Sequence, residues 1–324
     1  NNNKEEQLIE VQHLTKFYKD FCAVNNISIT INKGDILGLL GPNGAGKTTT
    51  LRMLTGYMRP SAGSINIQGL KMPDDALKIK SLIGYLPESA PLYHNMLVYD
   101  YLDYVARIKG ITGKENRYDR LLELVDSCGL SSIMHKPVGE LSKGLKQRVG
   151  LAHAMMTQPE VLILDEPTSG LDPNQIVEIR DIIKRIGKEK PIILSTHILS
   201  EAEATCNRIA IINNGRVVAD DTSAKLKQSV QQQSLIHLSL KNADEAKALD
   251  LLNAIDQKME ISVVEPMEEG LLSFEIKTFG EEDFRSAIYQ KIKSTEWLLV
   301  HMARESRSLE KIFRELTREV EKDI

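Results

Sequence analysis

Two patterns of hydrophobic residues alternate along the first two thirds of the chain. Short apolar runs of strand length occupy residues 8–14, 27–31, 36–40, 161–164 and 192–195. Apolar residues at helical spacing occupy about 46–56, 97–109, 116–128, 143–156 and 173–187. This alternation predicts an α/β domain with a mixed, mostly parallel sheet covered by helices. Because such sheets bind ligands beyond the carboxyl ends of their strands, the residues after the apolar runs are the first candidates for a functional site.

The last third of the chain has a different order of elements. Strand patterns at 234–240, 259–264, 271–278 and 297–302 alternate with helical patterns at 243–256 and 282–293. The order βαββαβ is typical of a small α+β, ferredoxin-like domain. A final amphipathic helix is predicted over 308–322. This part contains no cluster of catalytic residue types, and Trp297 and His301 are interpreted as partly buried core residues.

Length and charge support a division into two domains. At about 150 residues per domain, a chain of 324 residues predicts two. Residues 1–228 hold 28 Lys and Arg against 26 Asp and Glu, and residues 229–324 hold 13 against 19, so net charges of +2 and −6 give the −4 of the chain. We therefore expect an N-terminal domain over 1–228, with a helical subdomain at about 90–158, and an accessory domain over 229–324. The first part is near neutral and the second is acidic, so no nucleic-acid partner is expected.

The remaining composition points to the cytoplasm. No apolar run reaches the roughly 18–20 residues that cross a bilayer, and the polar start of the chain predicts no signal peptide. Cys22, Cys128 and Cys206 cannot all pair and show no CxxC spacing, which favours a reducing compartment.

A phosphate-binding loop is predicted directly after the apolar run 36–40. The residues match GxxxxGK[ST] in full: Gly41, Pro42, Asn43, Gly44, Ala45, Gly46, Lys47 and Thr48, followed by Thr49. Glycines allow the backbone N–H groups to face phosphate oxygens, and the helix that follows adds its positive dipole end. Lys47 would reach the β- and γ-phosphates, and the Thr48 hydroxyl would bind Mg²⁺. The alternative is a glycine-rich turn that ends in Lys-Thr by chance.

An acidic pair follows the apolar run 161–164. Asp165 is predicted to bind Mg²⁺ through its water shell, and Glu166 to polarise a water for attack on the γ-phosphate. Acidic residues also end many strands without a catalytic role. The phosphate loop in the same chain is what favours the functional interpretation.

Further motifs carry a resemblance to a known family. Residues 141–148 place Ser142 and Gly144 at the start of a helix, about 20 residues before the acidic pair. By itself Ser142 is typical of a helix N-cap. This stretch resembles the signature sequence of ATP-binding cassette (ABC) ATPases. Residues 169–172, ending in Asp172, resemble the D-loop of that family, and 195–197, ending in His197, resemble its switch-histidine motif.

Two more positions extend the resemblance, which covers about residues 8–228. Tyr18 stands where the family has the aromatic residue that stacks on adenine, and 85–88 where it has the Q-loop. Two residues depart from the pattern. Glu88 replaces the Q-loop glutamine, and Lys143 replaces the first signature glycine. These departures put the rate of hydrolysis in question more than its existence.

The resemblance implies a P-loop NTPase fold of the ABC ATPase type, with ATP and Mg²⁺ as cofactors. The implied metal-binding residues are Thr48, Asp165 and Glu88, and the implied catalytic residues are Glu166 and His197. In this family two ATPase domains enclose two ATP molecules, so Ser142, Gly144 and Asp172 would serve the nucleotide of a second copy. The chain has one set of motifs, which predicts a homodimer.

The family also implies what ATP hydrolysis drives. We expect the ATPase subunit of a bacterial ABC transporter, located peripherally on the cytoplasmic face of the membrane and paired with a separate polytopic permease. Residues 308–317 resemble the ending of drug- and polysaccharide-exporter and gliding-motility-associated ATPases, which favours an exporter. An exposed terminal helix explains that segment equally well. The alternatives are an ABC ATPase that acts on ribosomes or DNA, and a nucleotide-dependent regulator.

Overall fold

The chain divides into two compact units. The structure, a computed structural model, describes residues 7–226, 233–256, 259–265, 270–279, 282–306, 310 and 313–314. Residue contacts separate the described residues up to Ser223 from those that begin at Ala224. The boundary expected at residue 228 lies among 227–232, outside the described residues, and stays a prediction.

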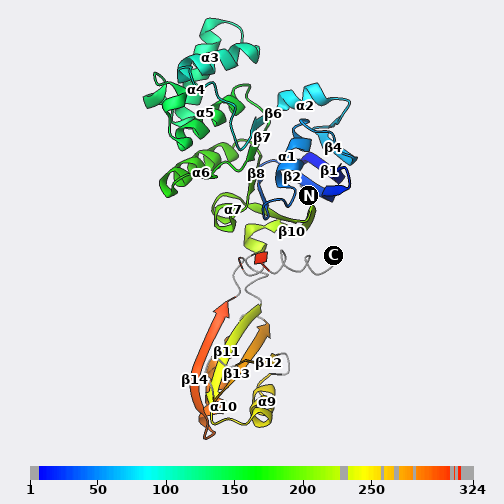
Figure 1. Ribbon diagram of the computed structural model, residues 1–324, viewed down its shortest axis with the longest axis vertical. Helices are drawn as coiled ribbons and strands as arrows, with labels where there is room; N and C mark the ends of the chain where they lie inside the picture. The colour runs from blue at the N-terminus through cyan, green and yellow to red at the C-terminus, as the bar shows by residue number, and fades with distance from the viewer. Residues whose placement is uncertain are drawn as a thin grey trace, which may run out of the picture. The chain divides into compact units, whose positions relative to one another are not determined.

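A six-stranded sheet forms the centre of the larger unit (Figure 1). Its order is β10-β9-β3-β8-β7-β6, and all neighbours are parallel except β10 and β9. The strands are β3 (Ile36–Leu40), β6 (Ile83–Leu86), β7 (Val161–Asp165), β8 (Ile192–Thr196), β9 (Arg208–Asn213) and β10 (Arg216–Thr222). Every residue of β3, β7 and β8 is buried, which explains their unbroken apolar runs. The predicted mostly parallel sheet is confirmed.

A second, antiparallel sheet lies in the same unit, in the order β2-β1-β4-β5. Its strands are β1 (Gln7–Tyr18), β2 (Phe21–Asn32), β4 (Ala62–Ile67) and β5 (Leu70–Lys71). The predicted strands 8–14 and 27–31 lie inside β1 and β2. Apolar residues of this sheet, of α1 (Lys47–Leu54) and of the six-stranded sheet form one buried cluster. That shared core fixes the phosphate loop between the two sheets.

Helices cover the sheets and form a cluster of their own. They are α2 (Ala76–Leu82), α3 (Val98–Ile108), α4 (Lys114–Cys128), α5 (Lys143–Met155), α6 (Pro173–Gly187) and α7 (Leu199–Thr205). The predicted helices agree with α1, α3, α4, α5 and α6 to within two residues at every end. Helices α3, α4 and α5 contact one another, and Figure 1 shows them at one end of the unit. None of the described helices is long and apolar enough to cross a membrane.

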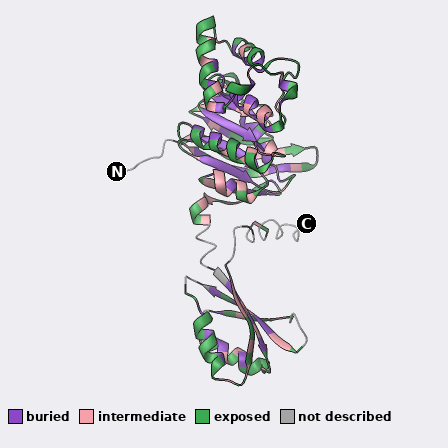
Figure 2. Ribbon diagram, turned by 90° about the vertical axis from the view of Figure 1, so that its left-hand side faces the viewer, coloured by how far each residue is buried: buried purple, intermediate pink, exposed green. Residues whose placement is uncertain are grey.

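The second unit has the predicted order βαββαβ. Its elements are β11 (Gln233–Lys241), α9 (Glu245–Asn253), β12 (Glu260–Val264), β13 (Leu271–Phe279), α10 (Arg285–Lys293) and β14 (Leu298–Ser306). The antiparallel sheet runs β12-β13-β11-β14. Alternate residues of β11, such as Ile236, Leu238 and Leu240, pack with residues of α9 and α10, as period-2 alternation requires. Figure 2 shows buried residues along these strands.

Two expectations for this unit have different outcomes. Trp297 is half-buried against the apolar cluster, as predicted. His301 is exposed, so its interpretation as a core residue was wrong. It lies opposite Ser239 on the sheet face turned away from the helices, which an open four-stranded sheet leaves to solvent. The helix predicted over 308–322 lies almost entirely outside the described residues.

Candidate functional site

Strand register brings the predicted site residues to one edge of the six-stranded sheet. Leu40 of β3 pairs with Thr196 of β8, and Ser195 of β8 pairs with Asp165 of β7. Leu86 of β6 lies beside β7 as well. Because these strands are parallel, the loops that follow them leave from the same edge. The phosphate loop, the acidic pair, the switch histidine and Glu88 therefore come together although they are far apart in sequence.

The phosphate loop has the close backbone approaches that require glycine. Gly46 has φ 102°, and a Cβ on it would lie 2.4 Å from the carbonyl oxygen of Ala23. A Cβ on Gly41 would lie 2.2 Å from the carbonyl oxygen of Ile212. No other residue fits these positions without a backbone shift. The tight loop sets Lys47 at the first residue of α1.

The Lys47 ammonium group lies inside this loop. It donates hydrogen bonds to the carbonyl oxygens of Gly41 (2.8 Å) and Pro42 (3.2 Å). It also pairs with Glu166, at 3.5 Å from Nζ to Oε1, and only 6% of its side chain is exposed. The ammonium group therefore occupies the loop centre, where an anion would meet a buried positive charge.

A buried network holds the acidic pair in place. Asp165 Oδ1 accepts hydrogen bonds from the hydroxyls of Thr48 (3.0 Å) and Ser195 (2.6 Å). The same Ser195 hydroxyl accepts the backbone N–H of Glu166 at 2.9 Å. Ser195 is the first residue of the motif 195–197 but is not among the predicted site residues. Its position opposite Asp165 depends on the register of β7 and β8, which the sequence does not reveal.

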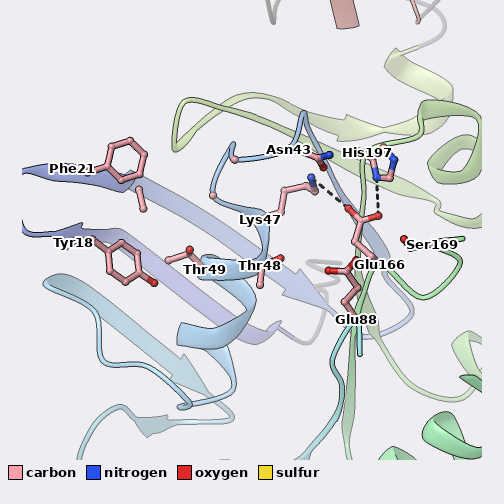
Figure 3. A pocket seen from close by; sticks show the side chains of 13 residues that line it. Tyr18, Phe21, Asn43, Lys47, Thr48, Thr49, Glu88, Glu166, Ser169 and His197 are labelled. Carbon is pink, nitrogen blue, oxygen red and sulfur yellow. Dashed lines mark hydrogen bonds and ion pairs between the residues drawn. The ribbon is translucent and has the colours of Figure 1, made fainter. Parts of the chain in front are cut away.

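Glu166 is held between two basic side chains (Figure 3). Oε1 faces Lys47, and Oε2 is 2.9 Å from Nδ1 of His197. Its backbone has φ 48°, a left-handed conformation that costs a residue with a side chain roughly 1–2 kcal/mol. Backbone strain of this kind clusters at functional sites. The result is a carboxylate aimed at the space beside the phosphate loop.

These groups surround a pocket with a volume of about 370 Å³. Ten residues predicted as site residues line it: Tyr18, Asn43, Gly44, Gly46, Lys47, Thr48, Thr49, Glu88, Glu166 and His197. Phe21, Ala23 and Ser169 line it too and were not predicted. The Tyr18 ring is 42% exposed, with Lys16 Nζ 5.7 Å from its centroid. An exposed ring at the rim is suited to stacking on a flat, apolar part of a ligand.

The signature residues form a separate cluster that does not line this pocket. Ser142 caps α5, because its hydroxyl accepts the backbone N–H of Leu145 at 3.3 Å. Gln175 Nε2 lies 3.4 Å from the same hydroxyl, and a Cβ on Gly144 would meet Gln175 at 2.7 Å. Asp172 caps α6 by accepting the N–H groups of Asn174 and Gln175. The structure thus brings Ser142, Gly144 and Asp172 together through Gln175, away from the chain's own phosphate loop.

The two departures from the family pattern lie in different places. Glu88 lines the pocket. Lys143 extends toward the D-loop, since a Cβ on Gly170 would lie 2.6 Å from its Nζ. Only Glu88 thus adds charge beside the phosphate loop.

The oxygen donors at this edge fit a magnesium ion. Among the described residues, no three His, Cys, Asp or Glu side chains gather as a metal-binding group. Mg²⁺ in nucleotide sites takes one or two carboxylates and completes its shell with phosphates and water. The adjacent oxygens of Thr48 and Asp165 match that requirement. Burial raises the pKa of the neighbouring Tyr85 phenol, and the Asp165 carboxylate raises it further, so Tyr85 adds no charge at neutral pH.

Comparisons with known proteins agree with this geometry. Residues 24–169 match the protein family described as ABC transporter. The chain is 38% identical over 234 residues to an uncharacterized ABC transporter ATP-binding protein of Bacillus subtilis, YxlF, covering 72% of this chain and 77% of the relative. It is also 38% identical over 267 residues to the bacitracin transport ATP-binding protein BcrA of Bacillus licheniformis, covering 82% and 84%.

A solved structure has the same fold as the larger unit. It is a dimeric ATP-binding cassette in a post-hydrolysis state, bound to ADP and Pi. The similarity covers 67% of this chain and 99% of that chain, at 25% identity and a TM-score of 0.61.

Proposed function

Since this chain belongs to the ABC transporter family, as an ATP-binding subunit that hydrolyses ATP, we propose that it powers export through a separate membrane subunit. One observation carries the catalytic part of the proposal. Glu166 lies between Lys47 and His197 at the edge of a phosphate loop, where its carboxylate could accept a proton from a water beside the γ-phosphate. Similarity to a bacitracin transport protein and the resemblance of 308–317 to exporter ATPases support the direction of transport.

We further propose that the working form is a homodimer. Ser142 and Gly144 are phosphate-binding residue types at a helix N-terminus, yet they do not line the pocket of their own chain. A second copy related by a twofold axis would bring its signature to this pocket and receive the same in return. The dimeric state of a similar cassette is consistent with this arrangement.

The proposed roles follow from the contacts of each residue. Lys47 leaves the loop carbonyls and offsets charge on the β- and γ-phosphates together with the loop N–H groups. Tyr18 stacks on adenine. Glu166 orients and deprotonates the attacking water, and His197 contacts the γ-phosphate. Thr48, Asp165 and Glu88 would hold Mg²⁺, which supplies further positive charge to the phosphates when bound.

The membrane subunit and the location of the chain are tested by purification. We expect the protein, extracted with mild detergent from the membranes of its own host, to copurify with a polytopic membrane protein. The same fraction should lack ribosomal subunits and nucleic acid. Recovery with ribosomes in a salt-resistant fraction would instead support the alternative function in translation. The predicted peripheral attachment to the membrane requires the protein to be released by alkaline washing without detergent.

The proposed role of Ser142 in binding the nucleotide of a second copy can be separated from its role as a helix cap. Aspartate is as good an N-cap as serine, whereas alanine costs about 0.5–2 kcal/mol. We therefore expect Ser142→Asp to keep the stability of the protein but to lose ATP-dependent dimerisation, because the new carboxylate would repel the facing phosphate. Ser142→Ala should lose both stability and ATP-dependent dimerisation. Urea unfolding and light scattering measure the two effects, and a Ser142→Asp variant that still dimerises with ATP would show that the signature does not bind nucleotide.

A further inference from the structure

A glutamate outside the predicted motifs connects the two loops that carry the proposed catalytic residues. Glu201 lies on α7, which begins two residues after His197. One carboxylate oxygen, Oε2, accepts two hydrogen bonds. The Thr168 hydroxyl donates at 2.5 Å, and the Thr196 hydroxyl donates at 3.2 Å.

Each threonine stands close in sequence to a different proposed catalytic residue. Thr168 stands two residues after Glu166 and directly before Ser169, which lines the pocket. Thr196 directly precedes His197, and its hydroxyl also accepts the backbone N–H of Ile198 at 3.1 Å. The carboxylate therefore ties the segment after β7 to the last residue of β8, directly before His197.

The chemistry of this contact suits a carboxylate. An ionised carboxylate only accepts hydrogen bonds, so one oxygen can receive two hydroxyls without conflict. Hydrogen bonds to an ionised group are shorter and about twice as strong as neutral ones. Glu201 does not line the pocket. It therefore acts through other residues and does not touch the nucleotide.

We propose that Glu201 is a positioning residue that fixes the carboxylate of Glu166 against the imidazole of His197. The two segments converge where these groups are 2.9 Å apart, and Glu201 bonds to the residue two positions after Glu166 and to the residue directly before His197. The pairing of β7 with β8 and the Ser195 hydroxyl still join the two strands without Glu201. The residues beyond that pairing lose two bonds, and the water that Glu166 orients loses its alignment. This inference rests on the proposed roles of Glu166 and His197.

The test compares the kinetics of Glu201 variants. We expect Glu201→Ala to lower kcat for ATP hydrolysis by about 10–100-fold, the range that a misplacement of about 1 Å can cause. The KM for ATP should change by less than threefold, because the phosphate loop is not bonded to Glu201. Glu201→Gln, which keeps one acceptor oxygen, should lie between the wild type and Glu201→Ala. The matched control, Glu203→Ala, removes a carboxylate from the same helix and should keep the wild-type kcat.

A double-mutant cycle separates positioning from a general structural role. If Glu201 acts through Glu166, adding Glu201→Ala to Glu166→Gln should lower kcat by less than threefold further. A full additional loss would overturn the inference, and so would a kcat for Glu201→Ala equal to that of the wild type. If Glu201→Ala fails to fold, Thr168→Val and Thr196→Val test the same two bonds by the same cycle. Unchanged hydrolysis in Glu166→Gln alone would instead contradict the proposed catalytic role of Glu166.

Discussion

Glu166→Gln is expected to lower kcat for ATP hydrolysis by about 10²–10⁴-fold, the usual contribution of a general base. Glutamine has the same shape and can still hydrogen-bond to His197, so the pocket should keep its geometry. It cannot take a proton from water. ATP binding should therefore survive while turnover does not. Phosphate release under saturating ATP measures kcat, and titration calorimetry measures ATP binding.

A matched substitution shows whether the loss is specific to this position. Glu178→Gln makes the same chemical change on α6, where the carboxylate is 56% exposed and pairs with Arg148. It should leave kcat within twofold of the wild type. Hydrolysis by Glu166→Gln at the wild-type rate would remove Glu166 from the catalytic step.

Lys47→Ala is expected to weaken ATP binding by about 10–100-fold, since a hydrogen bond to a charged group contributes about 1.5–3 kcal/mol. The physical reason lies in the neighbours of Lys47. Its ammonium group is the cation 3.5 Å from the Glu166 carboxylate. Removing it takes the lysine's positive charge from between that carboxylate and the negative phosphates. Fluorescence titration with a labelled ATP analogue gives the affinity.

The control for this substitution is a lysine on the surface. Lys78 has a side chain that is 72% exposed and pairs with Asp75, so Lys78→Ala should bind ATP as the wild type does. A circular dichroism spectrum of Lys47→Ala that matches the wild type would show that the loss is local. ATP affinity within twofold of the wild type in Lys47→Ala would contradict the assignment of the phosphate loop.

Much of the site could be predicted because its parts are local in sequence. The phosphate loop needs only a buried strand, glycines at fixed places and a helix that begins at Lys47, and all three are visible in consecutive residues. Ser195 and Phe21 could not be predicted in the same way. Ser195 acts through the pairing of β7 with β8, and Phe21 reaches the pocket from the other sheet. Contacts between distant segments leave no mark in a single sequence.

The fold shows the same division between local and distant information. Long amphipathic helices have strong periodic patterns, so α6 was predicted with its correct ends. Strands β3, β7 and β8 were visible as unbroken apolar runs. The short helices α2 and α7 were not predicted, because seven residues span only two turns and give too few apolar positions. Strand β10 is half-exposed and carries Asp220 and Asp221, which obscure the apolar pattern of a strand.

The central claim is that two copies of this chain complete each other's ATP site, and the mass of Glu166→Gln in solution tests it most directly. Light scattering after size exclusion should give the mass of one chain without nucleotide and of two chains with Mg²⁺ and ATP. The dimer should contain one ATP per chain and disappear when Ser142→Asp is added. A protein that binds ATP and stays monomeric, or a dimer that forms without nucleotide and tolerates Ser142→Asp, would contradict the account.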